Sequence, residues 1–269
     1  MVNFNHTLFN QHKTYPYESK SFRTAGAGGI GLEMVKAFVA LGARVFVCDI
    51  NAEALSELEK VVLGVETMVC DVSSRTDVEK MVTLCAETLG GLDVLINNAG
   101  IAGPTAPVEE MDPAQWEKVM QVDLNGTFYV TRMAIPHLKK STSGVIINMS
   151  SVAGRFGYEN RSPYSTAKWG IIGFTKTLSI ELGKYGIRAN AILPGAVEGP
   201  RINQVLEDRA KANQTTLDEE KENALSVQSI KQFVDPKDIA ALAVFLASDS
   251  AKMISGQILP IDGDMQKAS

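Results

Sequence analysis

Short apolar runs alternate with amphipathic stretches along the chain from about residue 24 onward. Each apolar run has hydrophobic side chains at consecutive positions, which is the pattern of strands buried on both faces of a parallel sheet. Between the runs, apolar residues recur at helical spacing, as in the stretch 30–41, which ends at Gly42. The predicted strands are residues 43–49, 66–71, 92–97, 145–150, 188–193 and 257–261.

Strands that alternate with helices predict βαβ units. We therefore expect an α/β fold: a Rossmann-type doubly wound parallel sheet in three α/β/α layers, built as a single domain. The 269 residues, 45% of them hydrophobic, suffice for one large core. Asp112 and Asp235 each precede a proline and are expected to cap helices. The polar segment 198–233 fits either a flap over a pocket or a solvated helical insertion.

The N-terminal part of the chain does not follow the pattern. Residues 1–18 show no periodicity and are expected to form an irregular extension before a domain at 19–265. Residues 18–23 (ESKSFR) are far too polar for a central parallel strand, although a strand must precede the glycine-rich turn that follows. We therefore expect any strand at 19–24 to be short, and Arg23→Val to raise the melting temperature.

Composition excludes several other classes of protein. The net charge of -5 argues against a nucleic-acid binder, and no run of 18 apolar residues is present to span a membrane. The three cysteines form no CxxC pair, which favours buried, reduced thiols in a cytoplasmic protein. The three histidines have no metal-ligand spacing, so no metal site is expected.

A glycine-rich turn, 24–31 (TAGAGGIG), leads directly into the first predicted helix. Glycines let backbone amides approach a pyrophosphate, and a helix N-terminus favours its charge. Asp49 lies at the end of the next strand, 18 residues after Gly31, where a carboxylate binds the adenosine ribose. Its alternative role is to cap the helix that starts near Asn51. Because Asp49 repels a 2′-phosphate, we expect NAD to be preferred, with NADP possible.

Further motifs follow in order. Asp71-Val72 lies at the end of the predicted strand 66–71, and the sequence NNAG spans 97–100. Ser151 directly follows the predicted strand 145–150. The pattern YxxxK is formed by Tyr164 and Lys168, and Pro194-Gly195 and Asp262-Gly263 come later. In this order and spacing, the chain from about 24 to 265 resembles the single-domain branch of the short-chain dehydrogenase/reductase family.

The resemblance implies a site. The implied catalytic residues are Ser151, Tyr164 and Lys168, together with Asp123, which stands where the family has a catalytic asparagine. The implied cofactor-binding residues are Thr24, Gly29, Ile30, Gly31, Asp49, Asp71, Val72, Asn98, Ala99, Gly100, Tyr164, Lys168, Pro194, Gly195 and Val197.

Three other features depart from the family pattern: Ala25 replaces a glycine, Gly199 stands where a threonine often binds the nicotinamide, and the first strand is poor. Asp123 either holds the water of the family's proton relay or pairs locally and weakens it. A carboxylate, unlike an amide, cannot donate a hydrogen bond to that water.

The predicted function is hydride transfer between NAD(P) and a secondary alcohol or ketone, with Tyr164 as general acid/base. Lys168 lies four residues after Tyr164, so on a helix both share one face and the cation favours the phenolate. Ser151 is expected to hold the substrate oxygen. The alternative is a non-catalytic dinucleotide-binding or sensing protein. A sugar-nucleotide epimerase needs a longer chain, and an enoyl reductase spaces its tyrosine and lysine more widely.

The substrate pocket is expected at residues 102–105, 152–158 and from 198 onward. Arg155, Arg161 and Arg201 are candidates to meet an anionic group. Family members form dimers and tetramers through two long helices, expected here at 112–140 and 163–184. The apolar run 254–261 is a candidate second interface, so a homotetramer or homodimer is expected.

Overall fold

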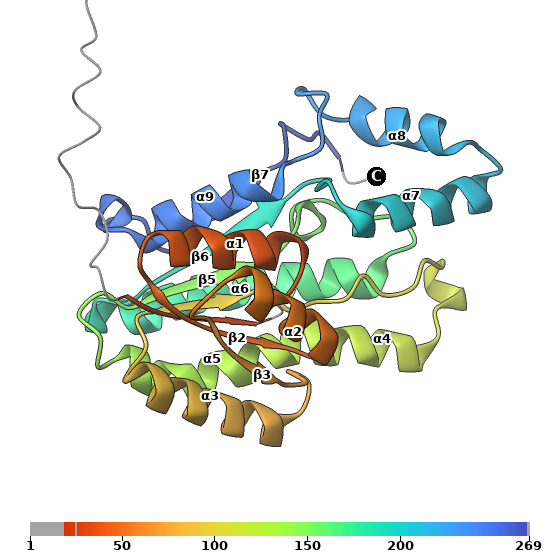
Figure 1. Cartoon of the computed structure of the whole chain (residues 1–269). Helices are drawn as coiled ribbons and strands as arrows, with labels where there is room; N and C mark the ends of the chain where they lie inside the picture. Colours follow the sequence, from red (N-terminus) through yellow and green to blue (C-terminus); the bar gives the residue numbers. More distant parts are fainter. Residues whose placement is uncertain (1–18, 25, 268–269) are drawn as a thin grey trace, which may run out of the picture.

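A single parallel sheet organises the computed structural model, which describes residues 19–24 and 26–267. Its strand order is β3-β2-β1-β4-β5-β6-β7, and the carboxyl ends of the strands share one edge (Figure 1). The doubly wound α/β fold predicted from the pattern is confirmed. The strands are β1 (Lys20–Thr24), β2 (Arg44–Asp49), β3 (Glu66–Val69), β4 (Val94–Asn97), β5 (Val145–Met149), β6 (Arg188–Pro194) and β7 (Ile258–Ile261).

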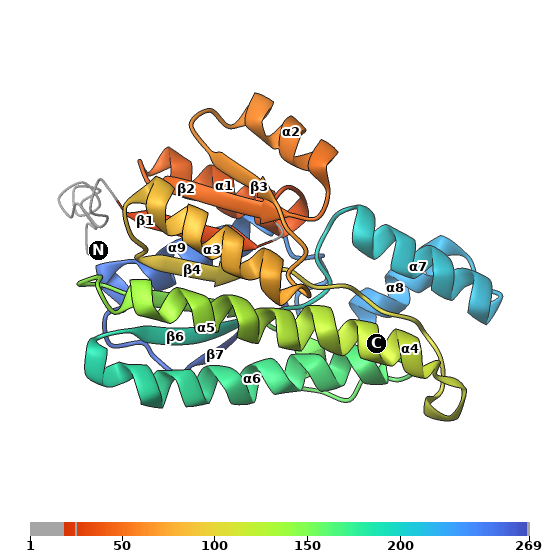
Figure 2. The ribbon, with the colours of Figure 1, turned by 90° about the horizontal axis from the view of Figure 1, so that it is seen from below.

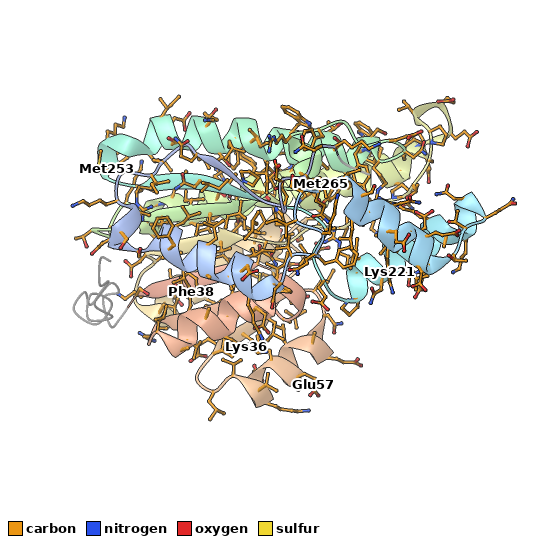
Figure 3. All side chains as sticks on the ribbon, turned by 90° about the horizontal axis from the view of Figure 1, so that it is seen from above. Lys36, Phe38, Glu57, Lys221, Met253 and Met265 are labelled. Carbon is orange, nitrogen blue, oxygen red and sulfur yellow. The ribbon has the colours of Figure 1, made fainter. Side chains whose placement is uncertain are left out.

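Helices cover both faces of the sheet and complete the three layers (Figures 1 and 2). One face carries α1 (Gly29–Ala40), α2 (Ala52–Val61) and α9 (Pro236–Ala247), and the other carries α3 (Arg75–Leu89), α5 (Thr127–Leu138) and α6 (Ser162–Leu182). Each face has its own apolar core. Phe38 of α1 is fully buried in one of them, beside α9 (Figure 3). Burial on both faces explains why the inner strands β2, β4, β5 and β6 are largely apolar.

Strand β1 corrects one expectation. Despite its polar sequence it lies at the centre of the sheet between β2 and β4, and with five residues it is longer than β4, which has four. Phe22 supplies its apolar contact, edge-on to Phe46 at a centroid distance of 6.0 Å. Ser19 and Ser21 are small enough to be buried within the sheet. Residues 1–18 and the side chain of Arg23 lie outside the described part.

Lys20 belongs in this strand because both ends of the residue find partners. Its backbone N–H donates to Asp93 Oδ2 at 2.9 Å, and its Nζ donates to the Gly90 carbonyl at 2.7 Å. Gly90 is the C-cap of α3, where carbonyls lack helical partners and a cation is favoured. The lysine charge therefore leaves the sheet at its amino edge.

The remaining helices lie largely at the carboxyl edge. A π-helical turn, η3 (Met120–Gly126), joins α4 (Pro113–Val119) to α5. Helices α7 (Pro200–Asn213) and α8 (Leu217–Ser226) project beyond the sheet (Figures 1 and 2). Asp112 and Asp235 cap α4 and α9 as predicted, accepting from backbone N–H groups. The short 3₁₀ turns are η2 (Val108–Glu110), η4 (Val152–Gly154), η5 (Gly183–Tyr185) and η6 (Asp249–Ala251).

Two further findings concern membrane-spanning helices and the cysteines. Across residues 19–24 and 26–267, no helix combines the length and apolar character needed to cross a membrane. All three cysteines are buried, and burial raises the pKa of the Cys85 thiol to about 12.

The polar first strand generates a stability prediction. Ser21 is fully buried and its Oγ has no hydrogen-bond partner. Ser21→Ala removes an unsatisfied hydroxyl without opening a cavity larger than one atom, so the free energy of unfolding should rise by about 1 kcal/mol. Urea denaturation measures this. Ser150→Ala is the matched control, because the buried Ser150 Oγ donates to the Lys168 carbonyl at 2.8 Å, and its loss should destabilise. A Ser21→Ala protein that loses stability contradicts the prediction.

Candidate active site

A cleft of about 510 Å³ opens at the carboxyl edge of the sheet. The strand order reverses between β1 and β4, and such a switch point is where α/β sheets bind ligands. Residues after β1, β2, β4, β5 and β6 form its walls, and α7 and α8 close one side. The predicted site residues on the wall are Gly29, Ile30, Asp49, Asn98, Gly100, Ser151, Tyr164, Lys168, Pro194, Gly195 and Val197.

The glycine-rich turn leaves open space at the start of α1. Gly29 has φ +51°, a conformation that favours glycine, and a Cβ at Gly28 or Gly29 would have no neighbour within 4 Å. Gly28 is the N-cap of α1 and no side chain caps the helix. An uncapped helix N-terminus behind unobstructed glycines fits a pyrophosphate. Ala25 lies outside the described residues.

Asp49 faces the cleft from the end of β2. Its Oδ2 accepts from the N–H of Ala27 at 3.3 Å, and its Oδ1 accepts from the N–H of Asn51 at 3.0 Å. The cap of α2 is Asn51 itself, which accepts from Glu53 and Ala54 N–H groups. The capping role that competed for Asp49 is therefore taken by another residue. A carboxylate fixed at this place fits the adenosine ribose of a dinucleotide.

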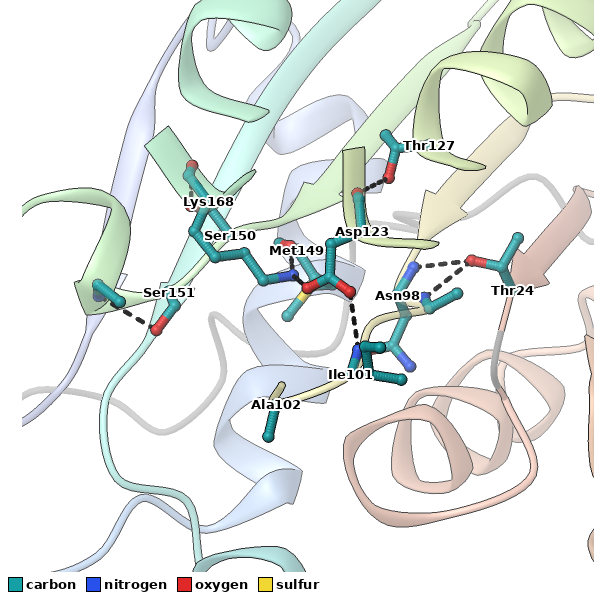
Figure 4. A network of polar contacts seen from close by, with 12 residues as sticks. Thr24, Asn98, Ile101, Ala102, Asp123, Thr127, Met149, Ser150, Ser151 and Lys168 are labelled. Carbon is teal, nitrogen blue, oxygen red and sulfur yellow. Dashed lines mark hydrogen bonds and ion pairs between the residues drawn. The ribbon is translucent and has the colours of Figure 1, made fainter. Parts of the chain in front are cut away.

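Thr24 joins the first and fourth strands behind the cleft. Its Oγ1 accepts from the N–H groups of Asn98 and Ala99, both at 3.0 Å (Figure 4). This contact fixes the start of the loop after β4. Thr24 and Ala99 support the wall and are not themselves part of its surface.

A chain of buried amides holds the next strands together. Asn97 Nδ2 donates to Thr131 Oγ1 at 2.9 Å and to Asn148 Oδ1 at 2.8 Å. Asn148 Nδ2 in turn donates to Thr175 Oγ1 at 2.9 Å. The chain therefore connects β4 and β5 to α5 and α6. Three side-chain hydrogen bonds thus tie these elements together, while Asn97 Oδ1 is buried without a hydrogen-bond partner.

Asp123 and Lys168 form a buried ion pair at the floor of the cleft (Figure 4). Asp123 is fully buried and Lys168 is 5% exposed, with Oδ2 3.3 Å from Nζ. The other carboxylate oxygen, Oδ1, accepts from the N–H of Ile101 at 2.8 Å, and Nζ donates to the Met149 carbonyl at 3.3 Å. Gly100 leaves room for the pair, because a Cβ there would lie 3.1 Å from both charged atoms.

Tyr164 lies beside this pair, one turn before Lys168 on α6. Lys168 Nζ is 5.4 Å from the centre of the Tyr164 ring, so the shared helix face predicted from their spacing is present. Ser151 follows β5 on the same wall, and its Oγ accepts from the N–H of Ala153 at 3.2 Å. Its hydroxyl proton is therefore available to a substrate oxygen.

Known proteins share the sequence and the fold of this chain. The family model described as enoyl-(acyl carrier protein) reductase matches residues 25–266. D-beta-hydroxybutyrate dehydrogenase from Cupriavidus necator is 36% identical over 245 residues, 89% of this chain and 95% of that protein. The structure of NAD+-bound xylitol dehydrogenase matches with TM-score 0.88 at 28% identity, covering 91% of this chain and 98% of that one. Actinorhodin polyketide ketoreductase with NADPH matches with TM-score 0.85 at 32% identity, covering 91% and 96%.

The chain belongs to the short-chain dehydrogenase/reductase family. Within this family it is an NAD(P)-dependent oxidoreductase that acts on an alcohol/carbonyl pair. The motifs quoted from the sequence are therefore those of a short-chain dehydrogenase/reductase, in the order that the family requires.

Some predicted cofactor residues lie off the cleft wall. Gly31 is buried in the first turn of α1. Asp71 Oδ1 accepts from the N–H and the Oγ of Ser73, at 2.9 and 2.7 Å, and so stabilises the turn after β3. Val72 is buried against Gly126, where a Cβ would lie 2.9 Å from the valine. None of these three is among the residues that line the cleft, although Gly31 directly follows Ile30, which is.

Other cleft residues fall in the range from 198 onward that the sequence interpretation gave, but it did not name them. Arg209 of α7, Ala224 of α8 and Met265 reach the wall from the C-terminal third, and Met265 lies beside the α7–α8 region (Figure 3). No motif marks them, because they come from the polar segment and from the chain end. Their position favours the flap interpretation of 198–233. Arg155, by contrast, is exposed and lies off the wall.

The buried ion pair generates the second prediction. Lys168→Met leaves the Asp123 carboxylate buried without its counter-charge, which should lower the free energy of unfolding by about 3 kcal/mol. Adding Asp123→Asn removes that charge while keeping an acceptor for Ile101, so stability should partly return. Urea unfolding of the two single variants, the double variant and the unaltered protein gives the coupling energy. Additive effects of the two substitutions mean that the pair is not coupled.

Proposed function

We propose that this chain oxidises a secondary alcohol, or reduces the corresponding ketone, with NAD as the preferred cofactor and Tyr164 as the general acid/base. The observation that carries the proposal is the buried Lys168 ammonium, 5.4 Å from the Tyr164 ring centre on a wall shared with the glycine turn and Asp49. Bound NAD supplies the hydride acceptor. The protein's task is then to position the substrate and to move one proton.

In the direction of oxidation, Tyr164 accepts the proton of the substrate hydroxyl. The Lys168 cation on the same helix face favours the phenolate that does this. Ser151 donates a hydrogen bond to the substrate oxygen and fixes its position. Asp123 acts on Lys168: both its carboxylate oxygens are engaged, by Ile101 and by the ammonium. Of the two roles weighed for Asp123, this contact supports local pairing, and Asp123 holds Lys168 in place.

The preference for NAD rests on Asp49. Structural relatives carry NAD+ in one case and NADPH in another, so family membership leaves the choice open. A carboxylate at the adenosine ribose repels a 2′-phosphate, and no lysine or arginine occurs in residues 25–31 to offset it. The glycines and the uncapped start of α1 serve either cofactor, so Asp49 makes the difference.

Two alternative activities are less well supported. The matching family model is described as an enoyl reductase, yet the tyrosine and lysine here lie four residues apart, the alcohol dehydrogenase spacing. A non-catalytic sensing role leaves no reason for Ser151, Tyr164 and Lys168 to line one cleft. Relatives named for hydroxy acids, such as D-beta-hydroxybutyrate dehydrogenase, make hydroxyl-bearing acids part of the proposed substrate range.

Assembly into a homodimer or homotetramer is part of the proposal. On α6, Ile180 is 82% exposed and Trp169 is 50% exposed, and on α5 Phe128 is exposed beside Phe174. Large apolar side chains that gather on neighbouring helices mark an interface. The three buried cysteines fit a cytoplasmic location.

The third prediction tests the proton transfer. Tyr164→Phe removes only the hydroxyl and should reduce kcat by at least about a thousandfold. The dissociation constant for NAD, measured by calorimetry, should change less than about threefold, since one hydrogen bond at most is lost. Tyr185→Phe on the surface is the control and should retain activity. Turnover in Tyr164→Phe near that of the unaltered protein contradicts the assignment.

The fourth prediction tests cofactor choice. The unaltered protein should have at least about tenfold higher kcat/KM with NAD than with NADP, a ratio that about 1.4 kcal/mol of repulsion produces. Asp49→Asn keeps the size and one acceptor oxygen but removes the charge, so the ratio should fall. Asp93→Asn, at the amino edge of the sheet, removes a charge far from the cleft and should leave the ratio unchanged. Equal kinetics with both cofactors in the unaltered protein show that Asp49 does not discriminate.

A further inference from the structure

Arg161 is buried in the cleft wall just before α6. It is 6% exposed, its Nη2 donates to the Ala102 carbonyl at 2.7 Å, and its Nη1 donates to Thr105 Oγ1 at 3.4 Å. Its Nε is buried with no hydrogen-bond partner. Burial lowers the pKa of the guanidinium, because the cation loses water there. The protein therefore buries a positive charge at the cleft and leaves one of its donors unused.

A second guanidinium, that of Arg201, lies beside the same tyrosine. Arg201, in the first turn of α7, has its Cζ 6.0 Å from the Tyr164 ring centre, and Arg161 has its Cζ 5.7 Å from it. Arg209 adds a third positive charge on the wall, where its Nη2 donates to the Tyr158 hydroxyl. Three arginines thus surround the end of the cleft that holds the catalytic tyrosine.

No carboxylate of the described residues forms an ion pair with Arg161 or Arg201. Over residues 19–24 and 26–267, no acidic oxygen lies within 4.0 Å of a nitrogen of Arg161 or Arg201. The acidic residues on the wall are Asp49, which is fixed at the glycine turn, and Glu198. Burying an unpaired cation such as Arg161 costs several kcal/mol in a folded protein, so a bound anion is its missing partner. Arg201 is exposed and carries its charge beside the same tyrosine.

The N-terminus of α7 adds positive electrostatic potential beside Arg201. Gly199 is its N-cap and supplies no side-chain acceptor, and the helix runs for 14 residues. The first N–H groups of α7 and the positive end of its dipole therefore adjoin the wall where Arg201 lies.

We propose that Arg161 and Arg201 form a subsite for the carboxylate of a small hydroxy acid, whose hydroxyl group faces Tyr164. The inference rests on the proposed function and names its substrate class. Both guanidinium groups lie close to the tyrosine ring, so the carboxylate and the reacting carbon are separated by only a few bonds. Two arginines, one already engaged by Ala102 and Thr105, suit a monoanion, and guanidinium forks match a carboxylate.

The test compares acids with their uncharged amides. The substrates are 2-hydroxybutyrate, 3-hydroxybutyrate and 4-hydroxypentanoate, each beside its carboxamide, with NAD in excess. For the best acid, kcat/KM should exceed that of its amide by at least about tenfold, the effect of one charge-assisted contact. Arg201→Gln should remove most of this preference. Arg155→Gln is the matched control, since Arg155 is exposed and lies off the wall, and should keep it.

Binding without turnover separates this inference from the proposed function. With NAD bound, butyrate should bind in calorimetry at least about tenfold more tightly than butyramide, and Arg201→Gln should abolish the difference. Equal binding of butyrate and butyramide overturns the subsite. Tighter binding of methyl phosphate than of butyrate overturns its assignment to a carboxylate. Butyrate selectivity without turnover of any hydroxy acid, amide or 2-butanol keeps the subsite and contradicts the proposed function instead.

Discussion

The buried contact between Lys168 and Asp123 is the interaction on which the site depends. A lysine at 5% exposure is stable only with a partner, and a carboxylate at 0% exposure needs one equally. Their contact joins four elements: the loop after β4 through Ile101, the π-helical turn through Asp123, β5 through the Met149 carbonyl, and α6 through Lys168. The pair therefore fixes α6 against the sheet edge. A π-helical turn is a frequent device at functional sites, and here it carries the carboxylate.

The sheet converts this local constraint into a cleft. Parallel strands bring their carboxyl ends to one edge, so the glycine turn, Asp49, the NNAG loop and Ser151 meet although they are far apart in sequence. The buried amides of Asn97 and Asn148 keep β4 and β5 in register with the helices beneath. In the proposed function, this part of the fold holds the cofactor and the proton-transferring groups, while α7 contributes Arg201 and Arg209 at the substrate end.

Most strands of the sheet could be predicted from the sequence because helices bury both faces of the sheet. Strands β2 to β7 appear as apolar runs within a few residues of their observed ends, and β1 does not, because small serines and a lysine that reaches Gly90 can occupy a central strand. The proposed catalytic residues were visible through fixed spacing within one helix or one loop. Asp71 and Val72 matched by motif, yet only side-chain packing shows that they lie off the cleft wall. The sequence also named Arg161 and Arg201 as candidates for an anionic group, but only the tertiary structure places both guanidinium groups beside the Tyr164 ring.

A crystal structure of the protein with NAD tests the central claim most directly. The pyrophosphate should lie at the start of α1, with the adenosine ribose against Asp49. Lys168 should contact the nicotinamide ribose while keeping Asp123 as its partner, with Tyr164 and Ser151 facing the nicotinamide ring. NAD bound outside this cleft, or a Lys168 that leaves Asp123 and turns away from the nucleotide, contradicts the role assigned to the ion pair.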